Sequence, residues 1–86
     1  MIKFDEIYPL TIITDRYNGT YSGASYLAFN LDYDEIPQEI NASDIDCYEF
    51  WSDNKDMVVG KGASIIEAIV DLMFKIDKER KKDEEI

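Results

Sequence analysis

The clearest periodic pattern in the chain lies near its C-terminal end, in residues 65–76. Apolar residues recur there at the three- and four-residue spacing of one helical face, over roughly three turns. Ser64 followed by Glu67 has the form of a capping box, in which two side chains satisfy backbone N–H groups at a helix start. The pattern predicts a helix whose apolar stripe faces a sheet, formed by Ile65, Ile66, Ile69, Val70, Leu72, Met73 and Ile76.

Charged residues are placed favourably along this predicted helix. Asp71 and Lys75 are four residues apart, which predicts an ion pair on the outer face. The basic residues that follow suit the negative end of the helix dipole; they are Lys78, Arg80, Lys81 and Lys82. Residues 79–86 are expected to fray as a tail.

The first third of the chain has the pattern of a β-hairpin. Residues 10–16 are rich in β-branched side chains, Asn18-Gly19 is a strong turn signal, and residues 20–31 form the expected returning strand. A two-residue turn at Asn18-Gly19 makes Leu10 face Leu27. This register predicts a core face with Leu10, Ile12, Leu27, Phe29 and Leu31, and an opposite face with Thr11, Ile13, Asp15, Ala24 and Tyr26.

The middle of the chain is less regular. Residues 32–41 form an acidic connection around Pro37. Residues 45–51 alternate imperfectly and predict a short strand, although Ser43 with Asp46 three residues later is equally typical of a helix start. Met57–Val59 predicts a last strand, ended by glycines. The resulting fold class is α+β, an antiparallel β-meander of three to four strands covered by one C-terminal α-helix.

With 86 residues, of which 45% are hydrophobic, the chain predicts one folded domain over residues 1–86, with a thin core and no large catalytic cavity. It has no basic start followed by an apolar run, and no apolar stretch of about 18 residues, so we expect neither secretion nor a membrane span. Cys47 has no partner for an intrachain disulfide. These features favour a reducing cytoplasm.

The residue types of common catalytic sites are missing. The chain has no His and one Cys, which excludes Ser-His-Asp and Cys-His catalysis and a multi-thiolate metal site. An EF-hand loop beginning at Asp32 would need an oxygen ligand at Ile36 and a glycine at Pro37. Residues 60–64 lack the spacing of a phosphate-binding loop. The sequence therefore predicts a protein that is not an enzyme and has neither cofactor nor metal.

Negative charge is concentrated in the middle of the chain. The formal net charge is -10, from 19 acidic and 9 basic residues, and residues 32–56 hold nine of the acids but only one lysine, a net charge of -8. Such a chain repels nucleic acid and favours a basic protein, such as one whose groove holds nucleic acid. The other interpretation is that the acids serve solubility alone.

Aromatic residues lie between these acids, as in many protein-binding hot spots. Phe50 and Trp51 are expected to pack in the core, which leaves Tyr33 and Tyr48 as surface candidates. The candidate partner-binding residues are Asp32, Tyr33, Asp34, Glu35, Glu39, Asp44, Asp46, Tyr48, Glu49, Asp53 and Asp56.

Part of the chain resembles the HicB-like family. The shared features are a strand at Ile12–Asp15, the glycine–tyrosine turn Gly19–Tyr21, and Gly62–Ser64 followed by Glu67-Ala68 at a helix start. The resemblance implies a β-meander with a helix and a toxin-neutralising role. The chain departs from the family in its longer 32–56 stretch, and in showing no DNA-binding module after Arg80.

In size and acidity the chain also resembles small proteins of bacteriophages and other mobile elements, some of which inhibit host defence systems. The leading hypothesis is a non-enzymatic, phage-encoded binding protein of the host cytoplasm. Like an anti-CRISPR protein, it would occupy the basic groove of a nucleic-acid-binding defence protein. The alternatives are a HicB-like antitoxin with a small basic toxin as partner, and a structural domain. The oligomeric state stays open, since an exposed edge strand could pair two copies.

Overall fold

The computed structural model describes residues 3–84; the side chains of Phe4 and of residues 81–84 lie outside the described part. Strands β1, β2 and β3 form one antiparallel sheet in that order, which confirms the predicted α+β class, the β-meander and the C-terminal helix. The elements in chain order are the 3-10 helix η1 (Phe4–Ile7), β1 (Thr11–Thr14), β2 (Tyr26–Phe29), the 3-10 helices η2 (Tyr33–Glu35) and η3 (Gln38–Asn41), α1 (Asp44–Asp53), β3 (Gly60–Gly62) and α2 (Ile65–Glu84).

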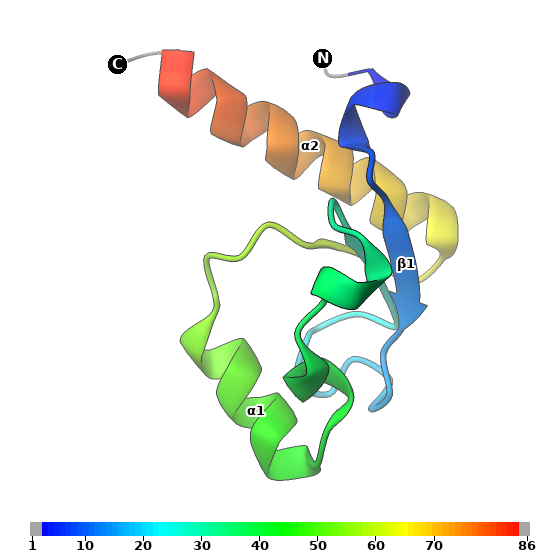
Figure 1. The fold of residues 1–86 in the computed structure, drawn as a ribbon. Coiled ribbons are helices and arrows are strands. Elements are labelled where there is room, and N and C mark those ends of the chain that lie inside the picture. The colour runs from blue at the N-terminus through cyan, green and yellow to red at the C-terminus, as the bar shows by residue number, and fades with distance from the viewer. Residues whose placement is uncertain (1–2, 85–86) are drawn as a thin grey trace.

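Both faces of the sheet are covered. Successive side chains of a strand point to opposite faces, so Ala28 contributes to one core while its neighbours in β2 contribute to the other. On the α2 side the fully buried residues are Ile7, Ala28, Ala68 and Leu72. On the α1 side the buried residues are Leu27, Phe29, Ile40, Cys47, Trp51 and Val59. Figure 1 shows α2 along one end of the molecule and α1 at the opposite end.

Strand β3 consists of the residues that were predicted to end it. The predicted strand at Met57–Val59 is wrong, because the paired residues are Gly60–Gly62. A Cβ on Gly60 would overlap the carbonyl oxygen of Ala68, and one on Gly62 would lie 2.6 Å from the Ala68 nitrogen. The two glycines therefore allow α2 to lie directly on the strand. They are required by this tertiary contact and not by a turn.

The hairpin register differs from the predicted one by three residues. Thr11 pairs with Phe29 and Ile13 with Leu27, whereas the prediction paired Leu10 with Leu27. An odd offset moves the β1 side chains to the other face. As a result, Ile13 packs against the α1-side core and Ile12 against the α2-side core, so the predicted core face, with Leu10 and Ile12 beside Leu27 and Phe29, is wrong.

The connection between β1 and β2 explains this offset. Asn18 and Gly19 have the positive φ values of a turn, 53° and 86°. However, they belong to a longer loop of successive turns and not to a two-residue hairpin turn. The Asp15 carboxylate holds this loop together, because it accepts hydrogen bonds from the Gly19 N–H and the Ser22 hydroxyl. Only Tyr26–Phe29 of the predicted returning strand is paired, since this long connection replaces a two-residue turn.

Residues 44–53 form α1, so the helical alternative is confirmed and the strand prediction for 45–51 is wrong. The Ser43 hydroxyl accepts a hydrogen bond from the Asp46 N–H at 3.4 Å and caps the helix. Cys47 and Trp51, four residues apart, point inward and anchor α1 to the core.

Helix α2 begins with the predicted cap. The Ser64 hydroxyl accepts from the Glu67 N–H at 3.2 Å, and the Glu67 carboxylate accepts from the Ala63 N–H at 2.9 Å. Its backbone is helical to Glu84, through most of the tail predicted to fray, and residues 85–86 lie outside the described part. Across the described residues, no helix combines the length and apolar character needed to cross a bilayer.

The predicted ion pair of α2 forms, with 2.8 Å between Lys75 Nζ and Asp71 Oδ2. It lies against β3 and not on the outer face as predicted. Asp71 accepts a hydrogen bond from the Lys61 N–H, and Lys75 donates one to the Val59 carbonyl, each at 2.8 Å. The pair therefore helps to hold α2 on the short strand.

Candidate acidic interface

The outer flank of α1 carries a row of carboxylates. The buried Cys47 and Trp51 define the side of α1 that faces the core. On another side of the helix lie Asp46, Glu49 and Asp53, which are three and four residues apart. Glu39 approaches them from η3, which packs against α1. These residues line a hollow of about 360 Å³, here called the acidic groove, made by Glu39, Asp46, Glu49, Phe50, Asp53 and Asn54.

The four carboxylates of the acidic groove are exposed, and none of them has a cation partner among the side chains that the structure describes. The ion pairs found among the described residues are Asp71–Lys75 and Glu6–Arg80, both of which involve α2. Asp53 lies in the last turn of α1, where no basic residue offsets the negative end of the helix dipole. A carboxylate there costs about 0.3–1 kcal/mol of stability. Asp53 thus adds negative charge to the groove at some expense to the helix that carries it.

Two other candidates lie in a neighbouring groove. Tyr33 and Asp34 line a hollow of about 440 Å³ together with Ile13, Ile36, Pro37, Gln38 and Asn41. Helix η3 contributes residues to both grooves, so they flank the same short helix. The Tyr33 ring is 77% exposed, the largest value among the exposed hydrophobic residues, which suits a contact residue.

Neither of these two grooves is lined by Asp32, Glu35 or Asp56. The Glu35 carboxylate accepts a hydrogen bond from the Asp32 N–H at 3.2 Å, which closes the η2 turn. Asp56 is exposed on the segment between α1 and β3. These three side chains have local or solvent-facing positions, although the sequence grouped them with the others.

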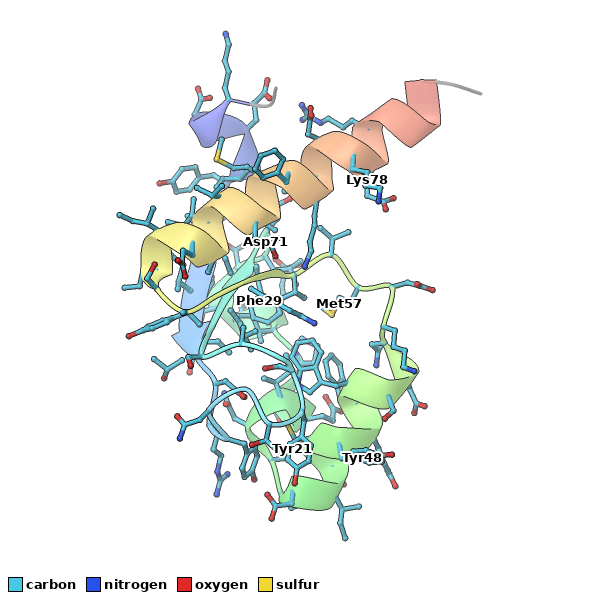
Figure 2. The ribbon with its side chains drawn as sticks, turned by 180° about the vertical axis from the view of Figure 1, so that it is seen from behind. Tyr21, Phe29, Tyr48, Met57, Asp71 and Lys78 are labelled. Atoms are coloured by element: carbon cyan, nitrogen blue, oxygen red, sulfur yellow. The ribbon has the colours of Figure 1, made fainter. Side chains whose placement is uncertain are left out.

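The remaining two candidates, Asp44 and Tyr48, lie beside the aromatic loop between β1 and β2. The Tyr48 and Tyr21 rings are 6.0 Å apart in an edge arrangement (Figure 2). The Tyr21 ring is also 5.4 Å from the Tyr17 ring. Desolvation raises the pKa of Tyr21, and the nearby Asp44 carboxylate adds to this effect. Sequence reasoning missed this cluster, because a hairpin prediction gave the tyrosines no common partner.

Tyr48 also lines a third hollow that differs in chemistry from the acidic groove. Its volume is about 570 Å³, and its lining includes Tyr21, Trp51, Lys55 and Lys61. The Lys61 ammonium lies 5.1 Å from the centre of the Trp51 ring. The structure therefore places Tyr48 outside the acidic groove, on the side of α1 that faces the aromatic loop.

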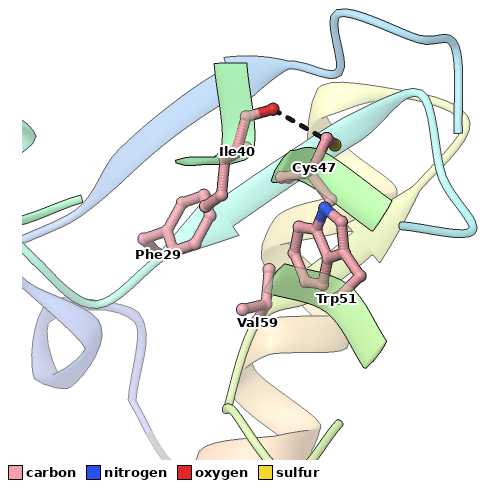
Figure 3. Packing of buried hydrophobic residues seen from close by; sticks show 6 residues of the cluster. Phe29, Ile40, Cys47, Trp51 and Val59 are labelled. Atoms are coloured by element: carbon pink, nitrogen blue, oxygen red, sulfur yellow. Dashed lines mark hydrogen bonds between the residues drawn. The ribbon is translucent and has the colours of Figure 1, made fainter. Parts of the chain in front are cut away.

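The core beneath α1 positions the acidic groove. The Trp51 ring packs edge-on against Phe50 at 5.2 Å, and Phe50 extends from the core to the groove. Cys47 is fully buried and donates to the Ile40 carbonyl at 3.4 Å, which joins α1 to η3 (Figure 3). Burial raises the pKa of the Cys47 thiol. A buried thiol of raised pKa is a packing residue and not a nucleophile.

Among the side chains that the structure describes, no group of three or more His, Cys, Asp or Glu residues is arranged to hold a metal ion. Comparison with protein-family models, curated proteins and solved structures gives no match to this chain.

Proposed function

We propose that the protein is a non-enzymatic binding protein that presents its acidic groove to a basic surface of another protein. The observation that carries this proposal is the convergence of Glu39, Asp46, Glu49 and Asp53 on one groove, with no cation partner among the described residues. Clustered charge of one sign steers an oppositely charged partner and selects against others.

The spacing of the charges suits a surface that normally holds nucleic acid. From Asp46 to Asp53 the helix rises about 10 Å and carries three carboxylates. One strand of DNA carries about three phosphates over that length. The carboxylates would stand in for phosphates, and Tyr33, in the groove on the other side of η3, would supply apolar contact area.

The proposed partner class is a nucleic-acid-binding protein of a bacterial defence system, and the proposed source of the chain is a bacteriophage or another mobile element. The protein would occupy the basic groove of its partner and compete with nucleic acid. Support comes from the net charge of -10, most of it in residues 32–56, and from the resemblance in size and acidity to small phage proteins.

The test begins with affinity capture from a bacterial lysate at low salt, elution at high salt and identification of the eluted proteins. Each purified candidate is then titrated against labelled DNA or RNA in the presence of this protein. We expect competition that weakens steeply with salt. The groove variant Glu49→Gln/Asp53→Asn should lose about tenfold in affinity, and the charge-matched control Asp5→Asn/Asp56→Asn much less. If the two variants lost the same affinity, the net charge of the protein would explain binding, and the proposal that the groove is the binding site would be wrong.

A second candidate function, a HicB-like antitoxin, is supported by the topology. The meander of three strands is followed by a helix that begins near Gly62–Ser64, with Glu67-Ala68 in its first turn, as the resemblance implies. This function requires a small basic toxin encoded beside the protein. Co-expression that restores growth against such a toxin, and no competition with nucleic acid for any captured protein, would favour the antitoxin.

A further inference from the structure

Helix α2 exposes an apolar stripe on the side that faces away from the sheet. Its members are spaced four residues apart; they are Ile66, Val70 and Phe74, with exposed fractions of 73%, 43% and 54%. The prediction that Ile66 and Val70 belong to the sheet-facing stripe is therefore wrong. Side chains at this spacing lie above one another on a helix and form one continuous row. Contiguous exposed apolar patches are often interaction sites. We call this row the α2 stripe.

We propose that the α2 stripe is a self-association surface, on which α2 of a second copy packs in the antiparallel direction. The two-fold axis lies near the position of residue 72 along the helix. Val70 of each copy then contacts Phe74 of the other, and each Ile66 meets the C-terminal part of the facing helix. The same patch is used on both copies, as a two-fold interface requires.

The charges that flank the stripe fit this arrangement. Glu67 and Lys78 are both exposed and lie on the same flank of the α2 stripe. In an antiparallel helix pair, residues on the same flank face one another across the interface. With the axis near residue 72, Glu67 of each copy meets Lys78 of the other, so the dimer gains two pairs of opposite charge. Figure 2 shows the position of Lys78 on the C-terminal half of α2.

The distribution of charge over the whole molecule favours this surface. Residues 65–84 contain six acidic and five basic residues, a net charge of -1, although the chain carries -10. Pairing through α2 keeps the acidic segments apart, because the α1-side and α2-side cores lie on opposite faces of the sheet. The proposed dimer would present one acidic groove at each end. The inference stands on α2 alone and does not depend on the proposed function.

The test uses sedimentation equilibrium of the full chain at protein concentrations from about 10 µM to about 1 mM. High concentrations are needed because a small interface of one helix pair is expected to associate weakly. The chain mass is 10.0 kDa, and we expect a reversible increase toward twice that mass. Glu67→Lys and Lys78→Glu should each weaken association about tenfold, since each places like charges opposite one another. An equimolar mixture of the two variants should associate again, because the mixed dimer has two Glu–Lys pairs.

Glu67 also caps α2, so Glu67→Gln provides a variant that keeps the cap acceptor and loses the charge. It should weaken association less than Glu67→Lys, with an unchanged circular dichroism spectrum. Val70→Asp should abolish association. A wild-type chain that stays monomeric throughout the range overturns the proposal, as does a mixture of the charge variants that associates no better than either alone. Monomeric protein that binds anionic lipid vesicles through Val70 would assign the stripe to a membrane surface instead.

Discussion

On the α2 side of the sheet the backbones of helix and strand lie almost in contact, whereas on the α1 side large side chains fill a wider space. Small residues create the first layer, with Gly60, Gly62, Ala28 and Ala68 at the contact. Phe29, Ile40 and Trp51 fill the second. The difference shows how this small chain divides its functions. The close layer fixes the sheet and α2, and the side-chain layer supports the helix that carries the acidic groove.

Removal of the largest side chain from the α1-side core should have the largest effect. Trp51 is 7% exposed and packs against Phe50. Trp51→Ala should lower the free energy of unfolding by about 3–5 kcal/mol, because it leaves a cavity in a thin core. Phe50→Ala removes a half-buried ring of the same helix and should cost less. Urea titration of both variants measures the difference. Equal losses in the free energy of unfolding would contradict the role of Trp51 as the main anchor of α1.

Addition of a single methyl group tests the close layer. In Gly60→Ala the new Cβ would overlap the Ala68 carbonyl and lie 2.6 Å from the Leu72 Cβ. We expect a loss of about 2–3 kcal/mol in the free energy of unfolding, because neither backbone can move away easily. Gly23→Ala is the control: its Cβ would meet nothing within 4 Å, although its φ of 93° disfavours alanine. If Gly60→Ala cost no more than Gly23→Ala, the close approach of α2 to β3 would not account for the glycine at position 60.

These two layers also differ in how far the sequence predicted them. The start of α2 follows from local signals, namely the Ser64–Glu67 cap and the helical spacing of apolar residues. Strand β3 could not be predicted, because Gly60 and Gly62 are required by a helix that follows later in the chain. Likewise, the hairpin register depends on a loop that folds around the buried Asp15 carboxylate.

The sequence predicted exposed acids in residues 32–56 but not how the structure groups them. The acids of residues 32–56 are exposed as expected, but a strand at 45–51 would have placed Asp46 with Tyr48 and Phe50 on one face. The helix groups Asp46 with Glu49 and Asp53 instead and turns Tyr48 toward Tyr21. The exposed Ile45 obscured the helical pattern of α1, because an apolar residue at the surface weakens the contrast between the two faces.

The two helix caps sharpen the comparison between the layers. Ser43→Ala removes the side-chain cap of α1, and Ser64→Ala removes that of α2, so each should cost about 1 kcal/mol. The consequences should differ, since α1 has only ten residues and a short helix is marginal without its anchors. Hydrogen exchange should become faster throughout α1 in Ser43→Ala, but only in the first turn of α2 in Ser64→Ala. Faster exchange throughout both helices would show that the layers unfold together.

The smallest expected effect separates stability from binding within the acidic groove. Asp46 lies in the first turn of α1 and Asp53 in the last. The helix dipole stabilises a carboxylate at the first position and destabilises one at the second, by about 0.3–1 kcal/mol each. Asp46→Asn should therefore lower the free energy of unfolding and Asp53→Asn should raise it, as measured by urea titration at low ionic strength. Both substitutions remove one negative charge from the same groove, so both should weaken binding to a basic partner. A substitution that stabilises the fold while it weakens binding would indicate that Asp53 is retained for contact with the partner. If Asp53→Asn left binding unchanged, the groove would extend only over the first turns of α1.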